Sequence, residues 1–186
     1  MMKIAKWSII LFLFSACAIG NAYVAEILQL KELISEVEKS KEDFKQIDFD
    51  QAYAISAETK AMMNKINKKY KGELTKEQAS IVNDFNNVKR LLKDFDRQHK
   101  RVNDEFERTN SQLNALLSTL EDGNTVDASG NQIDVNYVSK QMGIETKVAQ
   151  SLIREVDEFS KRCDRALNNY TKAKPAMENL LNELLP

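Results

Sequence analysis

Few residues in this chain are suited to chemistry, and His99 is its only histidine. Asp96 precedes His99 by three residues, a spacing that puts both side chains on one face of a helix. Carboxylate–histidine pairs with this spacing bind iron in helical bundles, but those sites need two pairs and further carboxylates from facing helices. Because this chain has one such pair, and because His99 lies between Phe95 and Val102 in an apolar series, we expect a packed histidine and no metal site.

A second group of polar side chains lies in the segment 122–134. Three oxygen-bearing residues alternate there: Asp127, Ser129 and Asn131. An EF-hand calcium loop that began at Asp127 would need glycine at position 132 and glutamate at position 138. Those positions hold Gln132 and Val138, so the pattern does not predict a calcium site.

The same segment predicts a small hairpin, with Val126 and Ile133 facing each other across a turn near Ser129-Gly130. Such a hairpin would cover one end of a helical bundle. The segment is long for a connection between two helices, which favours a tip that binds a partner. The candidate partner-binding residues are Val126, Asp127, Ser129, Asn131 and Ile133.

The N-terminus has the pattern of a secretory signal peptide, residues 1–22. Lys3 and Lys6 form a basic start, and a short apolar run ending at Phe14 is followed by small residues. This run is too short for a stable membrane span.

Two cleavage sites are possible in this signal. Phe14-Ser15-Ala16-Cys17 resembles the lipobox of bacterial lipoproteins, with Phe14 in place of the usual leucine. The resemblance implies cleavage before Cys17, lipidation of that cysteine and attachment to a membrane through its acyl chains. Cleavage after Ala22, at Gly20-Asn21-Ala22, would instead give a soluble periplasmic or secreted protein that begins at Tyr23. Both alternatives predict export from a bacterial cytoplasm.

Cys163 is the second of two cysteines, and Cys17 is either lipidated or removed with the signal. An internal disulfide is therefore not expected in the mature chain. Cys163, like His99, lies in a series of regularly spaced apolar residues, which is given below. Free cysteine is among the most buried residue types. We expect a thiol in the core, with oxidation or a link between two molecules as the alternative.

The composition excludes several classes of function. The formal net charge is −1, and removal of Lys3 and Lys6 with the signal makes the mature chain mildly more acidic. This charge gives no basic footprint for nucleic acid and no polybasic patch for anionic lipids. The sequence has no glycine-rich phosphate loop, no zinc-ligand spacing and no nucleophile elbow. We therefore expect no enzymatic activity, no cofactor and no small-molecule substrate.

The elements that carry these residues follow from a strict 4-3 spacing of apolar residues near the C-terminus. The series runs Val138, Met142, Glu145, Ala149, Leu152, Val156, Phe159, Cys163, Ala166, Tyr170, Ala173, Met177, Leu180, Leu184. Only Glu145 interrupts it. A repeat that averages 3.5 residues is typical of a helix packed along partner helices in a coiled coil.

Turn signals divide the mature chain into helical segments 24–71, 76–121 and 135–184. Thr75 with Gln78 forms a capping box, and Asp134 or Asn136 can cap the last segment. The second segment has its own 4-3 series through His99. The first is less regular: Lys41 interrupts it, and we expect a break near 46–50, where Asp48 can cap a new helix. Pro175 should bend the last turns of the third segment.

Three segments of nearly equal length predict antiparallel neighbours, because a shorter partner would leave part of an apolar series uncovered. The expected fold is all-α: one domain, residues 23–186, formed by an elongated antiparallel three-helix bundle of coiled-coil type. This shape resembles a single spectrin-type repeat, although no shared motif supports a common function.

The leading functional hypothesis is a non-enzymatic cell-envelope protein that acts as a structural spacer or a protein-binding module. The partner would be a protein, with membrane attachment only if Cys17 is lipidated. The first alternative is an exported chaperone or a subunit of a secretion or assembly apparatus. The second is a helical-bundle metal protein or enzyme, for which the sequence offers least.

Overall fold

The computed structural model describes residues 22–185, and this part of the chain is helical apart from turns and one short hairpin. The expected signal peptide and the lipidation candidate Cys17 lie outside the described residues, except for Ala22 at the end of the signal. The helices are α1 (Val24–Lys45), α2 (Phe49–Lys69), α3 (Lys76–Leu91), α4 (Phe95–Glu121) and α5 (Val135–Leu184).

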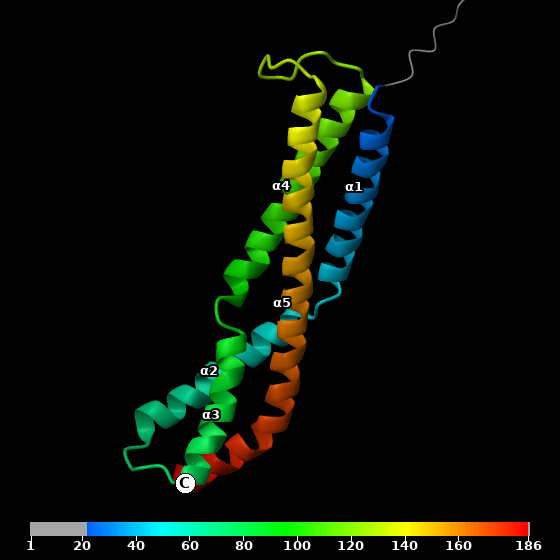
Figure 1. The fold of residues 1–186 in the computed structure, drawn as a ribbon. Coiled ribbons are helices and arrows are strands. Elements are labelled where there is room, and N and C mark those ends of the chain that lie inside the picture. The colour runs from blue at the N-terminus through cyan, green and yellow to red at the C-terminus, as the bar shows by residue number, and fades with distance from the viewer. Residues whose placement is uncertain (1–21, 186) are drawn as a thin grey trace, which may run out of the picture.

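The long helix α5 is the element shared by the two halves of the molecule. Its first half packs with α1 and α4, and its second half packs with α2 and α3 (Figure 1). At 1.5 Å per residue, the 50 residues of α5 span about 75 Å. The hairpin connection between α4 and α5 lies at the same end of the bundle as the start of α1.

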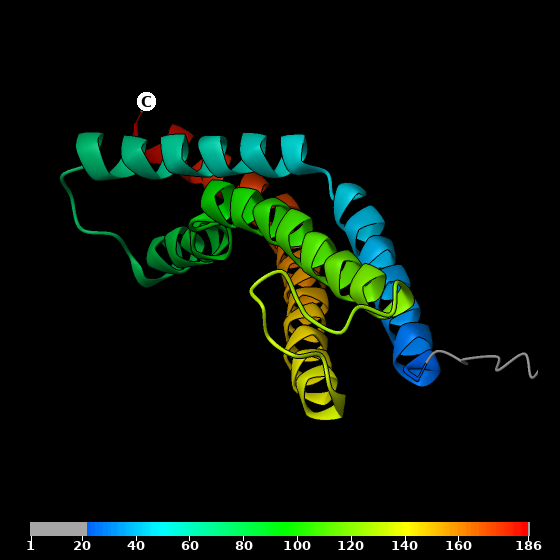
Figure 2. The same cartoon turned by 90° about the horizontal axis from the view of Figure 1, so that it is seen from above.

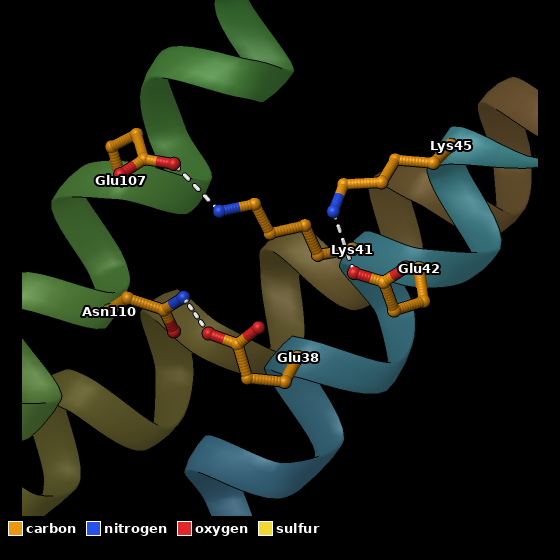
Figure 3. Close-up of polar contacts among 6 residues, drawn as sticks. All are labelled: Glu38, Lys41, Glu42, Lys45, Glu107 and Asn110. Atoms are coloured by element: carbon orange, nitrogen blue, oxygen red, sulfur yellow. Dashed lines mark hydrogen bonds and ion pairs between the residues drawn. The ribbon is translucent and has the colours of Figure 1, made fainter.

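Polar contacts give the direction of α1 relative to α4. Residues near the start of one helix contact residues near the end of the other, as three pairs show: Lys31–Glu121, Glu38–Asn110 and Lys41–Glu107. The two helices are therefore antiparallel. Lys41, which we expected within the apolar series, reaches across to Glu107 (Figure 3), and its Nζ donates to the carboxylate at 2.7 Å. Ser40 is buried on the inner face instead.

The apolar series of α5 forms the core-facing stripe, as predicted. All of its members are buried except Ala173 and Leu184, which pack partly buried against the core. Pro175 lies inside α5, and the last turns of this helix bend toward α3 (Figure 1).

Side-chain caps begin three of the helices at the predicted positions. The Thr75 hydroxyl accepts from the Gln78 amide while the Gln78 side chain accepts from the Thr75 amide, which completes the capping box of α3. The Asp48 carboxylate accepts from the amide of Gln51 at 2.8 Å and begins α2 after the expected break. Asp134 caps α5 in the same way.

The expected continuous helix 76–121 is wrong, because the chain leaves the helix between α3 and α4. Asp94 has a left-handed backbone with φ of 57°. Aspartate tolerates this conformation better than most residues, so no glycine or proline marks the break. Leu92 and Phe95 on either side of the turn are both buried, which is why the apolar spacing passes through it unchanged.

The described residues therefore form a helical bundle in which two of the three expected segments are interrupted, the first at the predicted break and the second at Asp94. Figure 2 shows α2 running in a different direction from α1, across the bundle rather than along it. The buried face of α2 packs on α3 and α5 through residues that include Ile55, Thr59 and Ile66. Burial of this face, and not continuity with α1, sets the direction of α2.

Thr109 allows a test of whether a polar group in the core lowers the free energy of unfolding. Its side chain is fully buried, and its hydroxyl finds no hydrogen-bond partner within residues 22–185. Thr109→Val keeps the shape and removes the unsatisfied hydroxyl, so the free energy of unfolding should rise by about 1 kcal/mol. Urea unfolding followed by circular dichroism measures it. In the control Thr171→Val, the lost hydroxyl is exposed and donates to the Leu167 carbonyl, so no gain is expected. A less stable Thr109→Val protein would contradict the prediction.

Candidate binding surface at the hairpin end

The connection between α4 and α5 folds as a hairpin, as predicted, but the predicted pairing of Val126 with Ile133 is wrong. Val126 and Gln132 form an antiparallel bridge, with Gly130 in the turn at φ of 84°. Glycine suits this position because other residues rarely adopt positive φ. The amide of Ile133 donates to the carbonyl of Thr125 at 2.8 Å, which closes the base of the hairpin.

Asp127 organises the hairpin from within. Its Oδ1 accepts from the amides of Ser129 and Asn131, and its Oδ2 accepts from the Asn131 side chain and the Tyr137 hydroxyl. These hydrogen bonds, those from Asn131 foremost, lower the pKa of Asp127 to about 2. Both oxygens are thus occupied in the hairpin itself, so Asp127 acts first as a structural residue.

The five predicted partner-binding residues have different surroundings. Val126 is 55% exposed, whereas Ile133 is 8% exposed and packs into the core. Asp127, Ser129 and Asn131 form the hydrogen-bonded turn. Val126 therefore offers the accessible apolar side chain of this set, and Ile133 fixes the hairpin on the bundle.

A groove of about 260 Å³ lies under the hairpin, between α4 and α5. We call it the tip groove, and its polar lining comes mainly from Gln112, Asp127, Tyr137, Gln141 and Glu145. The sequence pattern did not predict Gln112, Tyr137 and Gln141 as site residues. The only feature of the sequence that could have indicated this groove was Glu145, which interrupts the apolar series.

Exposed apolar side chains gather at this end of the bundle. Within residues 22–185, the exposed large apolar residues are Val24, Leu28, Val126, Val135 and Ile144. They belong to the first two turns of α1, the hairpin and the first three turns of α5. A second groove at this end is lined by Tyr23, Leu120, Thr125 and Ile133 among others, so the start of the described chain lies beside the base of the hairpin.

His99 lies away from this surface, at the level where the α1–α2 and α3–α4 breaks meet. Its ring stacks on Phe49 at 3.7 Å between centroids, and its Nδ1 is 2.9 Å from the Tyr53 hydroxyl. Phe44 lies 5.6 Å away, in the same cluster. The residue is half-buried, which agrees with the predicted packed histidine. Burial lowers the pKa of His99, and the nearby Asp96 carboxylate opposes that shift.

The lowered pKa predicts that acid weakens the fold near pH 6. The folded protein favours the neutral imidazole, so the unfolded chain takes up a proton first as the pH falls through about 6.5. Stability from this residue is full above that pH and is lost below it, with a slope of at most about 1.4 kcal/mol per pH unit. Thermal unfolding at pH 7.5, 6.5 and 5.5 should show the loss in wild type and a flatter profile in His99→Gln. Parallel profiles of the two proteins would contradict this role.

Cys163 lies in the core, as expected from its place in the series. Its side chain is 1% exposed, and burial raises the pKa of the thiol to about 11. A protonated and inaccessible thiol is a poor nucleophile and a poor metal ligand.

Two further observations concern the described part of the chain. Residues 22–185 contain no group of three histidine, cysteine, aspartate or glutamate side chains arranged to hold a metal ion. Within the same residues, no helix has the length and apolar character needed to cross a bilayer.

Comparison with protein-family models, with curated proteins and with solved structures finds no match for this chain. The hairpin end is therefore the feature of the described residues that bears most directly on function.

Proposed function

We propose that this chain is a non-enzymatic cell-envelope protein that acts as a spacer and a protein-binding module. In finer detail, we propose an elongated antiparallel three-helix coiled coil, interrupted at two points, as the spacer. The hairpin end is the binding surface. The α5 helix, about 75 Å long, supplies the rigid length.

One observation carries the proposal: the start of the described chain and the hairpin lie at the same end, where Ala22 and Tyr23 line a groove with Thr125 and Ile133. If Cys17 is lipidated, only five residues separate it from Tyr23. An extended chain of that length reaches about 20 Å, so the hairpin would be held close to the membrane. The partner would then be a protein at the membrane surface.

Mass spectrometry of the N-terminus from the native host tests the anchor. An acylated Cys17 at the N-terminus supports the membrane-proximal hairpin. A chain that begins at Tyr23 contradicts the anchor and leaves a free periplasmic or secreted protein.

A photo-reactive amino acid at position 126 tests the binding surface in living cells of that host. We expect an ultraviolet-dependent adduct of one discrete mass from Val126 and none from the exposed control position Asp164 on α5. Asp127→Ala should reduce the adduct, because the hairpin loses the carboxylate that organises its turn. Equal adducts from both positions, or none from either, would contradict the proposal. A broad series of adduct masses would favour the exported chaperone.

A further inference from the structure

The strongest unexplained feature of the molecule is the carboxylate of Glu145. Glu145 is the one polar residue in the α5 series, and its side chain is 9% exposed. Its Oε2 is buried and has no hydrogen-bond partner among the described residues. A buried carboxylate without a partner is costly, and proteins normally pair such groups.

The charge of Arg108 does not offset the cost of burying this carboxylate. Arg108 acts on Glu145 electrostatically, but its guanidinium donates to both carboxylate oxygens of Glu105, at 2.6 and 2.5 Å. Burial therefore outweighs Arg108 and raises the pKa of Glu145. The Oε2 of Glu145 still has no hydrogen-bond donor among the described residues.

Glu145 lines the tip groove, whose other polar groups include the Tyr137 hydroxyl and the amide side chains of Gln112 and Gln141. None of the residues that line the groove is basic. A lining rich in acceptors, with an unpaired carboxylate, favours a ligand that brings hydrogen-bond donors and positive charge.

The size and the surroundings of the groove further limit the kinds of ligand that it can bind. About 260 Å³ is less than the typical volume of a drug-sized ligand site and suits a single extended side chain. Val126 and Val135 are exposed and stand within two residues of Asp127 and Tyr137, which line the groove. An apolar surface beside a charged anchor is typical of protein interfaces.

We propose that the tip groove receives a lysine or arginine side chain from a protein partner, with Glu145 as the anchor that pairs with its charge. This inference rests on the proposed function, because it names the chemistry of the partner at the hairpin end. The cation supplies the hydrogen bond that Glu145 lacks, and Tyr137 and Gln141 supply acceptors along the groove.

A peptide titration followed by nuclear magnetic resonance tests the inference. The probes are acetyl-Ala-Lys-Ala-amide, the arginine peptide, and the norleucine peptide, which lacks the charge. The lysine or the arginine peptide should shift backbone amides in residues 127–129 and 137–145 in a saturable way, whereas the norleucine peptide should not. The tighter of the two basic peptides identifies the preferred cation. Equal shifts from basic and norleucine peptides would overturn the inference.

Variants of two glutamates on α5 add a matched comparison. Glu145→Gln keeps the shape and removes the charge, so the basic peptide should bind at least about tenfold more weakly. Glu155→Gln removes an α5 carboxylate that pairs with Arg101 outside the groove and should bind as wild type does. Unchanged binding by Glu145→Gln would overturn the inference. The wild-type peptide series needs no variant, so it decides the question even if Glu145→Gln folds poorly.

The outcomes separate this inference from the proposed function. Failure of the basic peptides together with a discrete adduct from position 126 would remove the cation groove and leave the binding module in place. Saturable binding of a basic peptide without any adduct from position 126 would support the cation groove and contradict the proposed binding module.

Discussion

Replacing Phe44 with alanine should lower the free energy of unfolding by about 3–5 kcal/mol. Phe44 is 1% exposed and lies where both helix breaks meet α5. Its ring is 5.1 Å from that of Phe49, 5.9 Å from that of Phe106 and 5.5 Å from that of Phe159. Removing the ring leaves a cavity between four helices that cannot close easily, because the surrounding rings hold one another in place.

Urea unfolding followed by circular dichroism measures this loss. The matched control is Ile144→Ala on α5, where the side chain is 43% exposed and the change should stay below about 1 kcal/mol. A similarly small loss for Phe44→Ala would mean that the aromatic cluster does not join the two halves of the bundle.

Glu145→Met should have the opposite effect and raise the free energy of unfolding by about 1–3 kcal/mol. Methionine follows the unbranched shape of glutamate and fills apolar space without a buried charge. The gain should be largest near neutral pH. It should shrink as the pH falls toward 4.5, because the raised pKa of Glu145 means that the folded protein takes up a proton there first and loses its unpaired charge.

Thermal or urea unfolding at pH 7.5 and pH 4.5 checks both the size and the pH dependence of the gain. Glu155→Met is the control, since its carboxylate is more exposed and already has a partner in Arg101. Glu145→Met should also abolish binding of the basic peptide, because the variant has no carboxylate to pair with its charge. A variant that is less stable than wild type would show that Glu145 has a structural partner within the protein.

Together these two expectations describe a chain that holds its shape through aromatic packing and loses stability at Glu145. Stabilising substitutions at binding sites commonly reduce function, because the destabilising group is retained for its ligand. Glu145 fits that pattern: the residue interrupts an otherwise apolar stripe and lines a groove beside the hairpin.

The sequence determined the features that depend on residues close together in the chain. Caps at Asp48, Thr75 and Asp134 were predictable because a capping side chain bonds an amide only a few residues away. The buried stripe of α5 was predictable because a 4-3 repeat places its members on one face of a helix. The hairpin was predictable from its turn residues and glycine.

The tertiary structure decided what depends on distant contacts. The break at Asp94 has no glycine or proline to signal it, since Leu92 and Phe95 keep the apolar spacing on both sides and the burial of both side chains helps to stabilise the turn. The direction of α2 follows from the α3 and α5 surfaces that cover its apolar face. The tip groove exists because α4, the hairpin and α5 meet there. The sequence alone showed that Glu145 interrupts the apolar series, and only the fold showed that this residue lines a groove.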